Sequence, residues 1–337
     1  MTAICRPRLN ARERFPVDAV VWTWNTCPRL MNSDRHTESV SARYSGLDAW
    51  EPDEILDALT EAQLAAVAAA RAARPALRRA ALAMESRLRY RGRLIYAGAG
   101  TSGRLAVQDG AELMPTFSWP EERLVLLMAG GSNALVRSVE GAEDEIERAE
   151  QLVQQHAVDG RDVLIAVAAS GTTAFTLACL RAAKRRAALT IGIANNFGTP
   201  ILEEADHPIW LDTGPEPIAG STRLKAGTAQ KIALNLLSTL LMILLGRVYD
   251  GLMVDVQAVN QKLVRRSEDI VMRVTGSSRD AARTALQQAR GSIKLAVMLL
   301  HGCDPERGAQ LLEQAHGRLR LALAATGRRG RRGTDAA

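Results

Sequence analysis

The chain has 337 residues, enough to bury a large core, and 47% of them are hydrophobic while only 4% are aromatic. This composition favours a helix-rich interior of small and aliphatic side chains over a β-sandwich. The net charge of +6 does not indicate a nucleic-acid-binding protein, because four arginines lie in one Gly-rich stretch, GRRGRRGTDAA, and the remainder is close to neutral. We therefore expect no nucleic-acid partner.

The cysteines and histidines fit neither a disulfide framework nor a metal site. The four cysteines lie far apart, and the five histidines form no Cys/His cluster. We expect no metal and a reducing compartment, the cytoplasm. The most apolar run, Ile232 to Leu245, is short for a bilayer and contains Asn235, Ser238 and Thr239. It predicts a buried helix and no membrane partner.

The predicted elements begin with helices. Residues 1–36 indicate a disordered extension or a mis-called start, because prolines and arginines interrupt them. From Glu51 onward apolar residues recur at a spacing of three to four, which predicts helix. Pro75 is expected to divide this stretch into two helices.

Strand and helix signals then alternate. Runs typical of strands lie at 94–97, 124–128, 163–167, 189–193 and 209–211, with helical segments such as 140–156 and 173–184 between them. This alternation predicts an α/β fold, a doubly wound parallel sheet flanked by helices. We place this domain, with its N-terminal helices, at residues 37–250.

Only helices are expected after Lys225. A long helix at about 225–249 precedes an amphipathic helix at 254–274 and three or four short helices that end near residue 325. We assign residues 251–325 to a helical C-terminal subdomain and 326–337 to a disordered basic tail.

Ligands bind at the carboxyl ends of the strands in such a sheet, and glycine- and hydroxyl-rich loops occur there at 98–103, 129–134, 168–173 and 220–228. The first and third share one design, in which a strand ends in small residues, hydroxyls with glycine follow, and a helix begins. Their candidate residues are Gly100, Thr101, Ser102 and Gly103 in the first loop and Ser170, Gly171, Thr172 and Thr173 in the third. Together they predict a cradle for one phosphate, since glycine permits close approach and helix N-termini offer free N–H groups. The alternative, ordinary turns and helix caps, stays open.

The first loop spells G-x-G-x-x-G, the outline of a dinucleotide-binding turn. A nicotinamide site also needs an acidic residue at the end of the second strand, and Ala129-Gly130-Gly131 stand there instead. A Walker loop needs a lysine that GTSGR lacks. The loop therefore suits a single phosphate, and we expect no cofactor.

Four segments in this order and spacing, GAGTSGRLAVQDGAELMPTF, VEGAED, IAVAASGTTAF and GSTRLKAGTAQK, resemble the N-acetylmuramic acid 6-phosphate etherases. The resemblance covers about residues 37–325. It implies a SIS domain with a five-stranded parallel sheet and helices on both faces. The regulatory protein of glucokinase shares these motifs but is longer, because it repeats the SIS unit.

The resemblance implies removal of the lactyl ether from C3 of a sugar phosphate, by elimination and hydration, in peptidoglycan recycling. It assigns the acid to Glu112 and the base to Glu143, and it adds Ser221 and Lys225 to the substrate-binding residues. From the residues alone, the acidic cluster around Glu143 is more typical of a helix start, and only the resemblance distinguishes Glu143 from its acidic neighbours. We expect Leu113, Met114 and Phe117 to surround Glu112 and to favour its protonated form.

Two departures from the family pattern concern this site. Thr172 stands where many relatives have an arginine. Lys225 is expected to replace the positive charge that is lost with that arginine. Leu113-Met114 replaces Cys-Pro.

An unbroken helix from Ser102 would carry Glu112 ~15 Å away. Either the chain turns at Asp109-Gly110, or Glu112 serves the phosphate loops of a second subunit. We favour the second option and a homodimer. A sugar-phosphate isomerase and a non-catalytic sugar-phosphate-binding regulator remain the alternative functions.

Overall fold

The computed structural model describes residues 36–256 and 261–326, so the predictions for residues 1–35 and 327–337 lie outside the described residues. Three short 3₁₀ helices, His36–Glu38, Ala42–Tyr44 and Leu47–Ala49, precede α1 (Pro52–Ala72) and α2 (Arg74–Leu88). The division at Pro75 is confirmed. Pro75 occupies the first turn of α2, where a missing N–H removes no helical hydrogen bond.

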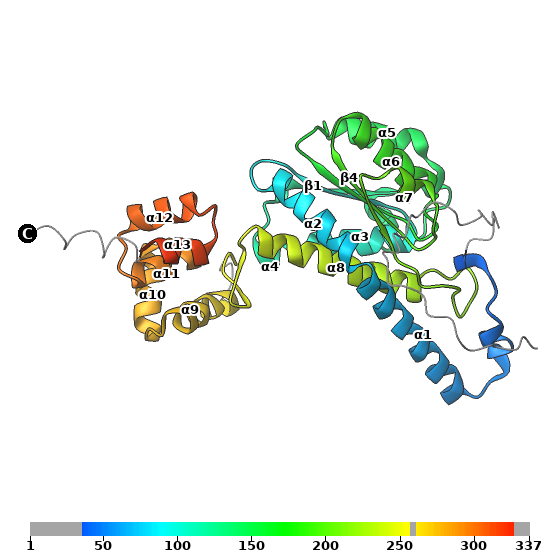
Figure 1. The fold of residues 1–337 in the computed structure, drawn as a ribbon, viewed down its shortest axis with the longest axis horizontal. Coiled ribbons are helices and arrows are strands. Elements are labelled where there is room, and N and C mark those ends of the chain that lie inside the picture. The colour runs from blue at the N-terminus through cyan, green and yellow to red at the C-terminus, as the bar shows by residue number, and fades with distance from the viewer. Residues whose placement is uncertain (1–35, 257–260, 327–337) are drawn as a thin grey trace, which may run out of the picture. The chain divides into compact units, whose positions relative to one another are not determined.

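The five predicted strands form one parallel sheet (Figure 1). They are β1 (Leu94–Gly98), β2 (Leu124–Met128), β3 (Val163–Val167), β4 (Leu189–Ala194) and β5 (His207–Trp210), in the order β2-β1-β3-β4-β5. Successive side chains of β1 enter different cores, since Leu94 and Tyr96 face one side of the sheet and Ile95 and Ala97 the other. The doubly wound α/β prediction is confirmed.

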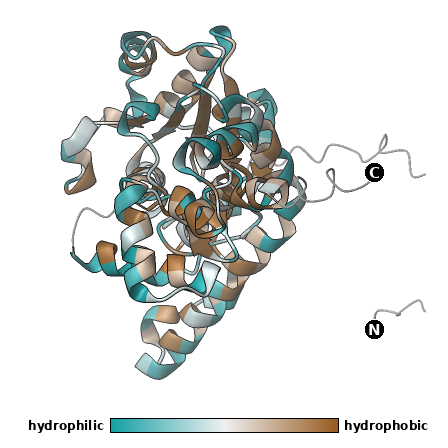
Figure 2. Ribbon diagram, turned by 90° about the vertical axis from the view of Figure 1, so that its left-hand side faces the viewer, coloured by the Kyte–Doolittle hydropathy of each residue, from teal (hydrophilic) through white to brown (hydrophobic). Residues whose placement is uncertain are grey.

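Helices cover both faces of the sheet. The core on one face contains residues of α2, α3 (Gly100–Ala111) and α8 (Lys225–Leu244), and the other contains residues of α5 (Ile146–Gln155), α6 (Ala174–Arg185) and α7 (Pro200–Glu204). The helix α4 (Leu113–Phe117) and 3₁₀ helices Glu121–Arg123, Gly131–Leu135 and Ala142–Asp144 lie in the connections. Figure 2 shows the hydrophobic strands enclosed between these helices.

The apolar helix α8 ends at Leu244, five residues before the expected end, because Gly246 adopts φ +78° and turns the chain. By length and composition α8 is the one helix among the described residues that would suffice to cross a membrane, yet half of its apolar window is buried. Its leucines at 234, 237 and 241 lie in the core against the sheet. This agrees with the buried helix expected from the sequence.

The polar residues inside α8 have partners. Asn235 Nδ2 and Ser238 Oγ donate to Asp109 of α3, at 2.7 and 3.2 Å, and the Tyr96 hydroxyl of β1 donates to the same carboxylate at 2.8 Å. Burial raises the pKa of Asp109, and these three hydrogen bonds oppose that shift. The cluster therefore fixes α8 against α3 and β1.

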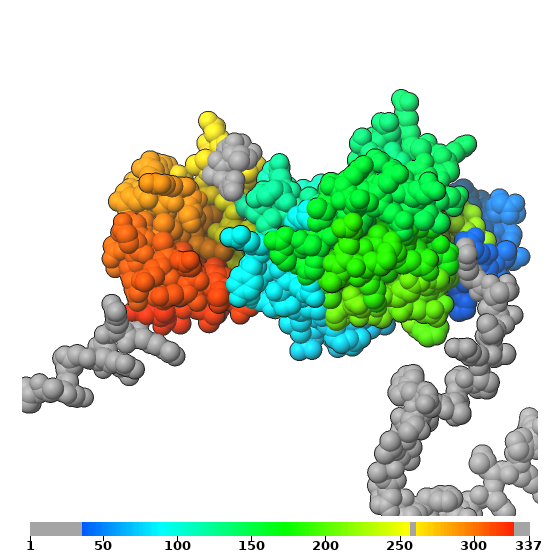
Figure 3. Space-filling view, turned by 90° about the horizontal axis from the view of Figure 1, so that it is seen from above, coloured from blue at the N-terminus to red at the C-terminus, as the bar shows by residue number. Residues whose placement is uncertain are grey.

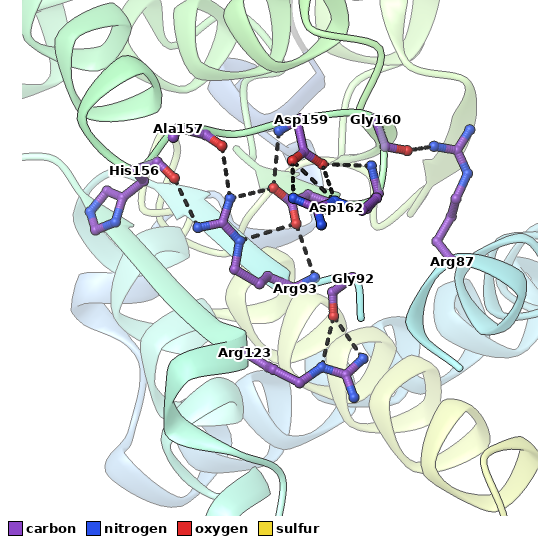
Figure 4. Close-up of polar contacts among 10 residues, drawn as sticks. Arg87, Gly92, Arg93, Arg123, His156, Ala157, Asp159, Gly160 and Asp162 are labelled. Carbon is purple, nitrogen blue, oxygen red and sulfur yellow. Dashed lines mark hydrogen bonds and ion pairs between the residues drawn. The ribbon is translucent and has the colours of Figure 1, made fainter. Parts of the chain in front are cut away.

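The amino ends of the strands are joined by arginines, as Figure 4 shows. Arg93, just before β1, makes a bidentate pair with the buried Asp162 before β3 and donates to the carbonyls of His156 and Ala157. Arg123, before β2, donates to the Gly92 carbonyl at 2.7 and 2.9 Å. These bonds hold the amino edge of the sheet, the edge opposite to the predicted ligand loops.

A short hairpin, β6 (Val248–Tyr249) and β7 (Leu252–Met253), leads to α9 (Gln261–Thr275). The helix expected from residue 254 does not begin there, since Val254 follows β7 directly, and residues 257–260 lie outside the description. Four short helices follow in residues 279–326, α10 (Arg279–Gln288), α11 (Ile293–Leu300), α12 (Pro305–Gln314) and α13 (Leu319–Thr326). Of the three or four short helices expected here, four are found among the described residues.

These four helices repeat one helical hairpin. The helices α10 and α12 begin twenty-six residues apart, and so do α11 and α13. ALQQARGSIKLAV (285–297) and LLEQAHGRLRLAL (311–323) align at this offset. Buried residues match in pairs, such as Ile293 with Leu319 and Ala296 with Ala322. This repeat was not among the predicted features.

Candidate active site

The first and third ligand loops lie side by side. Gly98 at the end of β1 is paired with Val167 at the end of β3, and the strand order reverses between these two strands. Such a switch point opens a crevice at the carboxyl ends of the strands. The two loops therefore form one edge, which we call the cradle (residues 98–103 and 168–173).

Glycines allow the first loop to pack closely under its helix. Gly100 starts α3 with φ +53°, and Ser102 and Gly103 are buried while Thr101 is half-buried. A Cβ on Gly103 would lie 2.5 Å from the Met128 sulfur and 2.7 Å from the Gly98 backbone. The N-terminus of α3 is thus held directly against the end of β1.

The third loop, residues 168–173, is ordered by its own hydroxyls. The Thr172 N–H donates to Ser170 Oγ at 3.2 Å, and Ser170 Oγ lies 3.2 Å from Thr173 Oγ1. Gly171 adopts φ +70°. Its lack of a side chain leaves room for Thr199, because a Cβ at this position would lie 2.1 Å from Thr199 Oγ1.

The helix-cap interpretation of the cradle hydroxyls finds little support in the geometry. The N-cap of α3 is Ala99, and Thr173, the N-cap of α6, makes no side-chain cap hydrogen bond. The first N–H groups of both helices therefore carry no side-chain cap, and hydroxyls lie beside them in the sequence.

The fourth loop joins the cradle through Gly227 of α8, whose missing Cβ would lie 3.4 Å from Thr101 Cγ2. Lys225 at the start of α8 is buried, and burial lowers its pKa while the nearby Glu216 opposes this. Glu216 is buried too and accepts the N–H groups of Lys225 and Ala226, at 3.1 and 2.8 Å. Ser221 lies half-buried in the turn before α8. This arrangement places the start of α8, which carries Lys225, beside the first loop of the cradle.

Two further residues, Asn196 and Thr37, lie at this edge, and neither was among the predicted site residues. The Asn196 side chain, after β4, donates to the Ala169 carbonyl and to Thr37 Oγ1, both at 3.0 Å. Thr37 is fully buried, and its carbonyl accepts the Gly220 N–H at 3.0 Å. In Figure 3 this blue N-terminal segment lies against the α/β domain. The polar pair Asn195-Asn196 directly after a strand was the available signal.

The candidate acid Glu112 lies at the junction of α3 and α4 and is exposed. The helix α3 continues through Gly110 to Ala111, so the turn considered at Asp109-Gly110 is absent. The expected apolar enclosure is also wrong within one chain, because Leu113 turns into the core and Met114 is 43% exposed. At 1.5 Å per residue Glu112 lies ~15 Å along the helix from Ser102.

The candidate base Glu143 lies in the 3₁₀ helix Ala142–Asp144 and is exposed, whereas Ala142 is buried. Arg104, the arginine of GTSGR, donates to the carbonyls of Ala134 and Arg137 at 2.9 and 3.2 Å. It therefore ties the segment that leads to Glu143 to the helix of the cradle. The expected helix from residue 140 starts at Ile146 instead.

The loop at 129–134 meets the cradle where the Ala129 N–H donates to the Gly98 carbonyl at 3.1 Å, and its later residues line a cavity. Gly130, Gly131 and Ser132 line a cavity of about 490 Å³ together with Val107 of α3 and Leu152 of α5. Among the described residues no group of three or more His, Cys, Asp or Glu side chains is placed to hold a metal ion.

Comparison with known proteins connects this geometry to a family. Residues 77–184 match the N-terminal SIS domain of glucokinase regulatory protein, and residues 133–240 match the SIS domain. The chain is 52% identical over 294 residues to the N-acetylmuramic acid 6-phosphate etherase of Deinococcus radiodurans, covering 87% of this chain and 96% of that protein. The chain belongs to the N-acetylmuramic acid 6-phosphate etherase family. The resemblance drawn from the four motifs is thereby confirmed.

Other similarities are lower. The etherase of Geobacillus thermodenitrificans is 42% identical over 288 residues, covering 85% of this chain and 98% of that protein. A solved phosphoheptose isomerase from Francisella tularensis is 22% identical, with a TM-score of 0.42 over 57% of this chain and 96% of that one.

The packing of the etherase cradle gives a stability prediction for Gly103→Ala. We expect the variant to lose about 1–3 kcal/mol of unfolding free energy, because the new methyl group would overlap Met128 and the Gly98 backbone. Urea unfolding measures this loss. Gly100→Ala is the control, since open space surrounds it and only its left-handed φ costs about 1 kcal/mol. Equal stability of Gly103→Ala and the parent chain would contradict the packing.

Proposed function

We propose that this chain cleaves the D-lactyl ether of N-acetylmuramic acid 6-phosphate and releases N-acetylglucosamine 6-phosphate and D-lactate, as a carbon–oxygen lyase. The observation that carries this proposal is 52% identity to an etherase over 96% of its length. The paired loops of the cradle support it, because they offer helix N-termini and hydroxyls to one phosphate.

The reaction requires an acid and a base on the ring-opened sugar. In the proposed assignment Glu143 removes the C2 proton, which the C1 aldehyde acidifies. The electron pair forms the C2–C3 double bond as the C3–O bond breaks, and Glu112 protonates the departing lactyl oxygen. Water then adds its hydroxyl to C3 and a proton returns to C2. No cofactor enters this sequence.

Phosphate recognition in the proposal uses Gly100, Thr101, Ser102 and Gly103 of the first loop and Ser170, Gly171, Thr172 and Thr173 of the third. Ser221 and Lys225 complete the site from the fourth loop. Lys225 supplies positive charge that Thr172, in place of an arginine, does not. Lys225 is buried at the start of α8, whose Gly227 approaches Thr101 of the cradle, and the field of a cation is screened less away from water.

Ser102→Ala and Ser170→Ala test this recognition. Each should weaken substrate binding by about 1–3 kcal/mol, because each removes a donor to an anion. The penalty should vanish for N-acetylmuramic acid without the 6-phosphate, and Ser132→Ala, from the loop outside the cradle, should bind as the parent chain does. Dissociation constants of the two sugars decide this. Equal losses on both would mean that the hydroxyls serve the fold alone.

We also propose a homodimer that works in the cytoplasm in peptidoglycan recycling, with no nucleic-acid or membrane partner. Exposed apolar side chains on α1 and α8, Leu64, Val67, Leu236 and Ile243, support the dimer, since a second copy would bury them. A groove of about 420 Å³ lies along α8 at Leu236 and Ile243. The exposed positions of Glu112 and Glu143 fit a site that a second subunit completes.

Lactate release tests the activity. The purified chain should form D-lactate and N-acetylglucosamine 6-phosphate in equal amounts from N-acetylmuramic acid 6-phosphate. Conversion of a sugar phosphate to an isomer without lactate would favour the isomerase, and binding without conversion would favour the regulator. Either result would remove the etherase proposal.

A further inference from the structure

A second, strongly cationic cavity of about 250 Å³ lies at the far end of α8. Four cations line it and come from four parts of the chain. Arg89 follows α2, Arg123 precedes β2, Arg247 follows α8, and Lys294 lies in α11. The described residues belong to one compact unit, so the cavity is part of a continuous fold.

This cavity is remote from the cradle. The helix α8 begins at Lys225 beside the cradle and ends at Leu244 next to the cavity. Its twenty residues span ~30 Å at 1.5 Å per residue. A ligand of the cavity is therefore separate from the sugar phosphate in the cradle.

Part of the cationic cluster is structural, because its arginines bind the last carbonyls of helices. Arg247 Nη1 donates to the Phe117 and Ser118 carbonyls at 2.6 and 3.0 Å. Arg123 donates to Gly92, as Figure 4 shows, and to the Leu88 carbonyl at 2.6 Å. Within residues 36–256 and 261–326, no hydrogen bond uses Arg123 Nη1 or Arg247 Nη2. Each guanidinium thus keeps donors for a ligand.

The positive charge on the walls exceeds the negative charge, even though Arg89 pairs with Glu85, which does not line the cavity. Among the lining residues Asp255 is the one carboxylate, and it already pairs with Lys294 Nζ at 2.7 Å and lies 3.7 Å from Arg247. The guanidinium carbons of Arg123 and Arg247 lie 4.4 and 5.4 Å from the centroid of the Trp119 ring. The ring orients both cations, yet it cannot neutralise them.

Burial makes this imbalance costly. The side chains of Arg247 and Lys294 are only 18% and 9% exposed. Burial lowers the pKa of Arg247, Arg123 and Lys294, and repulsion from Arg247 lowers the last two further. Buried charges of one sign are stable when a counter-ion accompanies them.

We propose that this cavity binds a phosphate group, as inorganic phosphate or as the phosphate of a small metabolite, between Arg123, Arg247 and Lys294. A dianion with several oxygens matches cations that approach from separate elements better than a carboxylate does. At roughly 30 Å³ per water molecule the volume exceeds that of phosphate alone, so an attached group has room. The bound anion would connect α8 with α11.

Isothermal titration calorimetry of the full chain at low ionic strength tests the site. Inorganic phosphate is titrated into the Ser102→Ala/Ser170→Ala background, in which binding at the cradle is weakened. Arg247→Met should weaken the remaining binding ~10-fold or more, because it removes a charged donor. Asp255→Asn should tighten it several-fold, since it removes the competing carboxylate. Arg185→Met, which removes an exposed partner of Glu150, should change nothing.

Arg247→Met should weaken phosphate binding and Asp255→Asn should tighten it. If one variant folds poorly, the other therefore still tests the proposal. D-lactate, a carboxylate, should not bind. Titration with N-acetylglucosamine 6-phosphate shows which kind of phosphate the cavity accepts. If this ester binds and the Arg247 and Asp255 variants change its affinity in the same way, the ligand is a phosphate ester. If it does not bind, the ligand is inorganic phosphate. If phosphate does not bind, or if Asp255→Asn weakens binding, the cluster only holds the fold together. That result would leave the etherase proposal untouched.

Discussion

Replacing either Glu112 or Glu143 with glutamine is expected to lower the rate of lactate release by ~10²–10⁴-fold, while the product phosphate still binds. Glutamine keeps the size of the side chain but neither accepts the C2 proton nor protonates the ether oxygen. Single-turnover lactate formation measures the loss. Glu147→Gln is the matched control, because it changes another exposed glutamate nearby and should retain activity.

Solvent deuterium exchange at C2 separates the two roles. Exchange needs the base, so it should vanish in Glu143→Gln and persist in Glu112→Gln, which is blocked only at departure of lactate. The reverse pattern would exchange the roles. Full activity in both variants would mean that other groups carry the proton transfers.

The second large effect is expected from mixing two defective chains. The inactive Glu112→Gln protein and the Ser102→Ala/Ser170→Ala protein should regain activity after subunit exchange, to as much as half of the sites in each heterodimer. One site then combines an intact cradle with an intact Glu112 from the partner, and the other site has both defects. The unbroken course of α3 through Gly110 motivates this arrangement, because it keeps Glu112 ~15 Å along the helix from Ser102.

Lactate assays of the mixture, after mass spectrometry has verified the heterodimers, measure the recovery. A mixture of Glu112→Gln with Glu112→Ala is the control and should stay inactive. If verified heterodimers of the first pair also stay inactive, Glu112 and the cradle act within one chain.

The fold was largely predictable from the sequence because each strand is a short β-rich run followed by a helix. The strands at 124–128 and 163–167 have the predicted bounds, and the break at Pro75 follows from proline geometry. The cradle was also predictable, since a strand, a glycine–hydroxyl loop and a helix N-terminus recur at 98–103 and 168–173. The resemblance to the etherases then supplied the reaction.

The remaining features depend on tertiary contacts that no local pattern contains. The enclosure expected around Glu112 was wrong because Leu113 faces the core rather than the glutamate. Thr37 reaches the cradle through Asn196, which lies far away in the sequence. The cations Arg89, Arg123, Arg247 and Lys294 lie in four separate segments, so only the fold gathers them into a cavity.

The reaction in water enriched in oxygen-18 tests the central claim most directly. Elimination followed by hydration breaks the C3–O bond, so mass spectrometry should find the label on C3 of N-acetylglucosamine 6-phosphate and none in the hydroxyl of D-lactate. A parallel reaction in deuterium oxide should place a deuterium atom at C2. Label in the lactate hydroxyl, or formation of product without lactate, would contradict the proposed lyase chemistry.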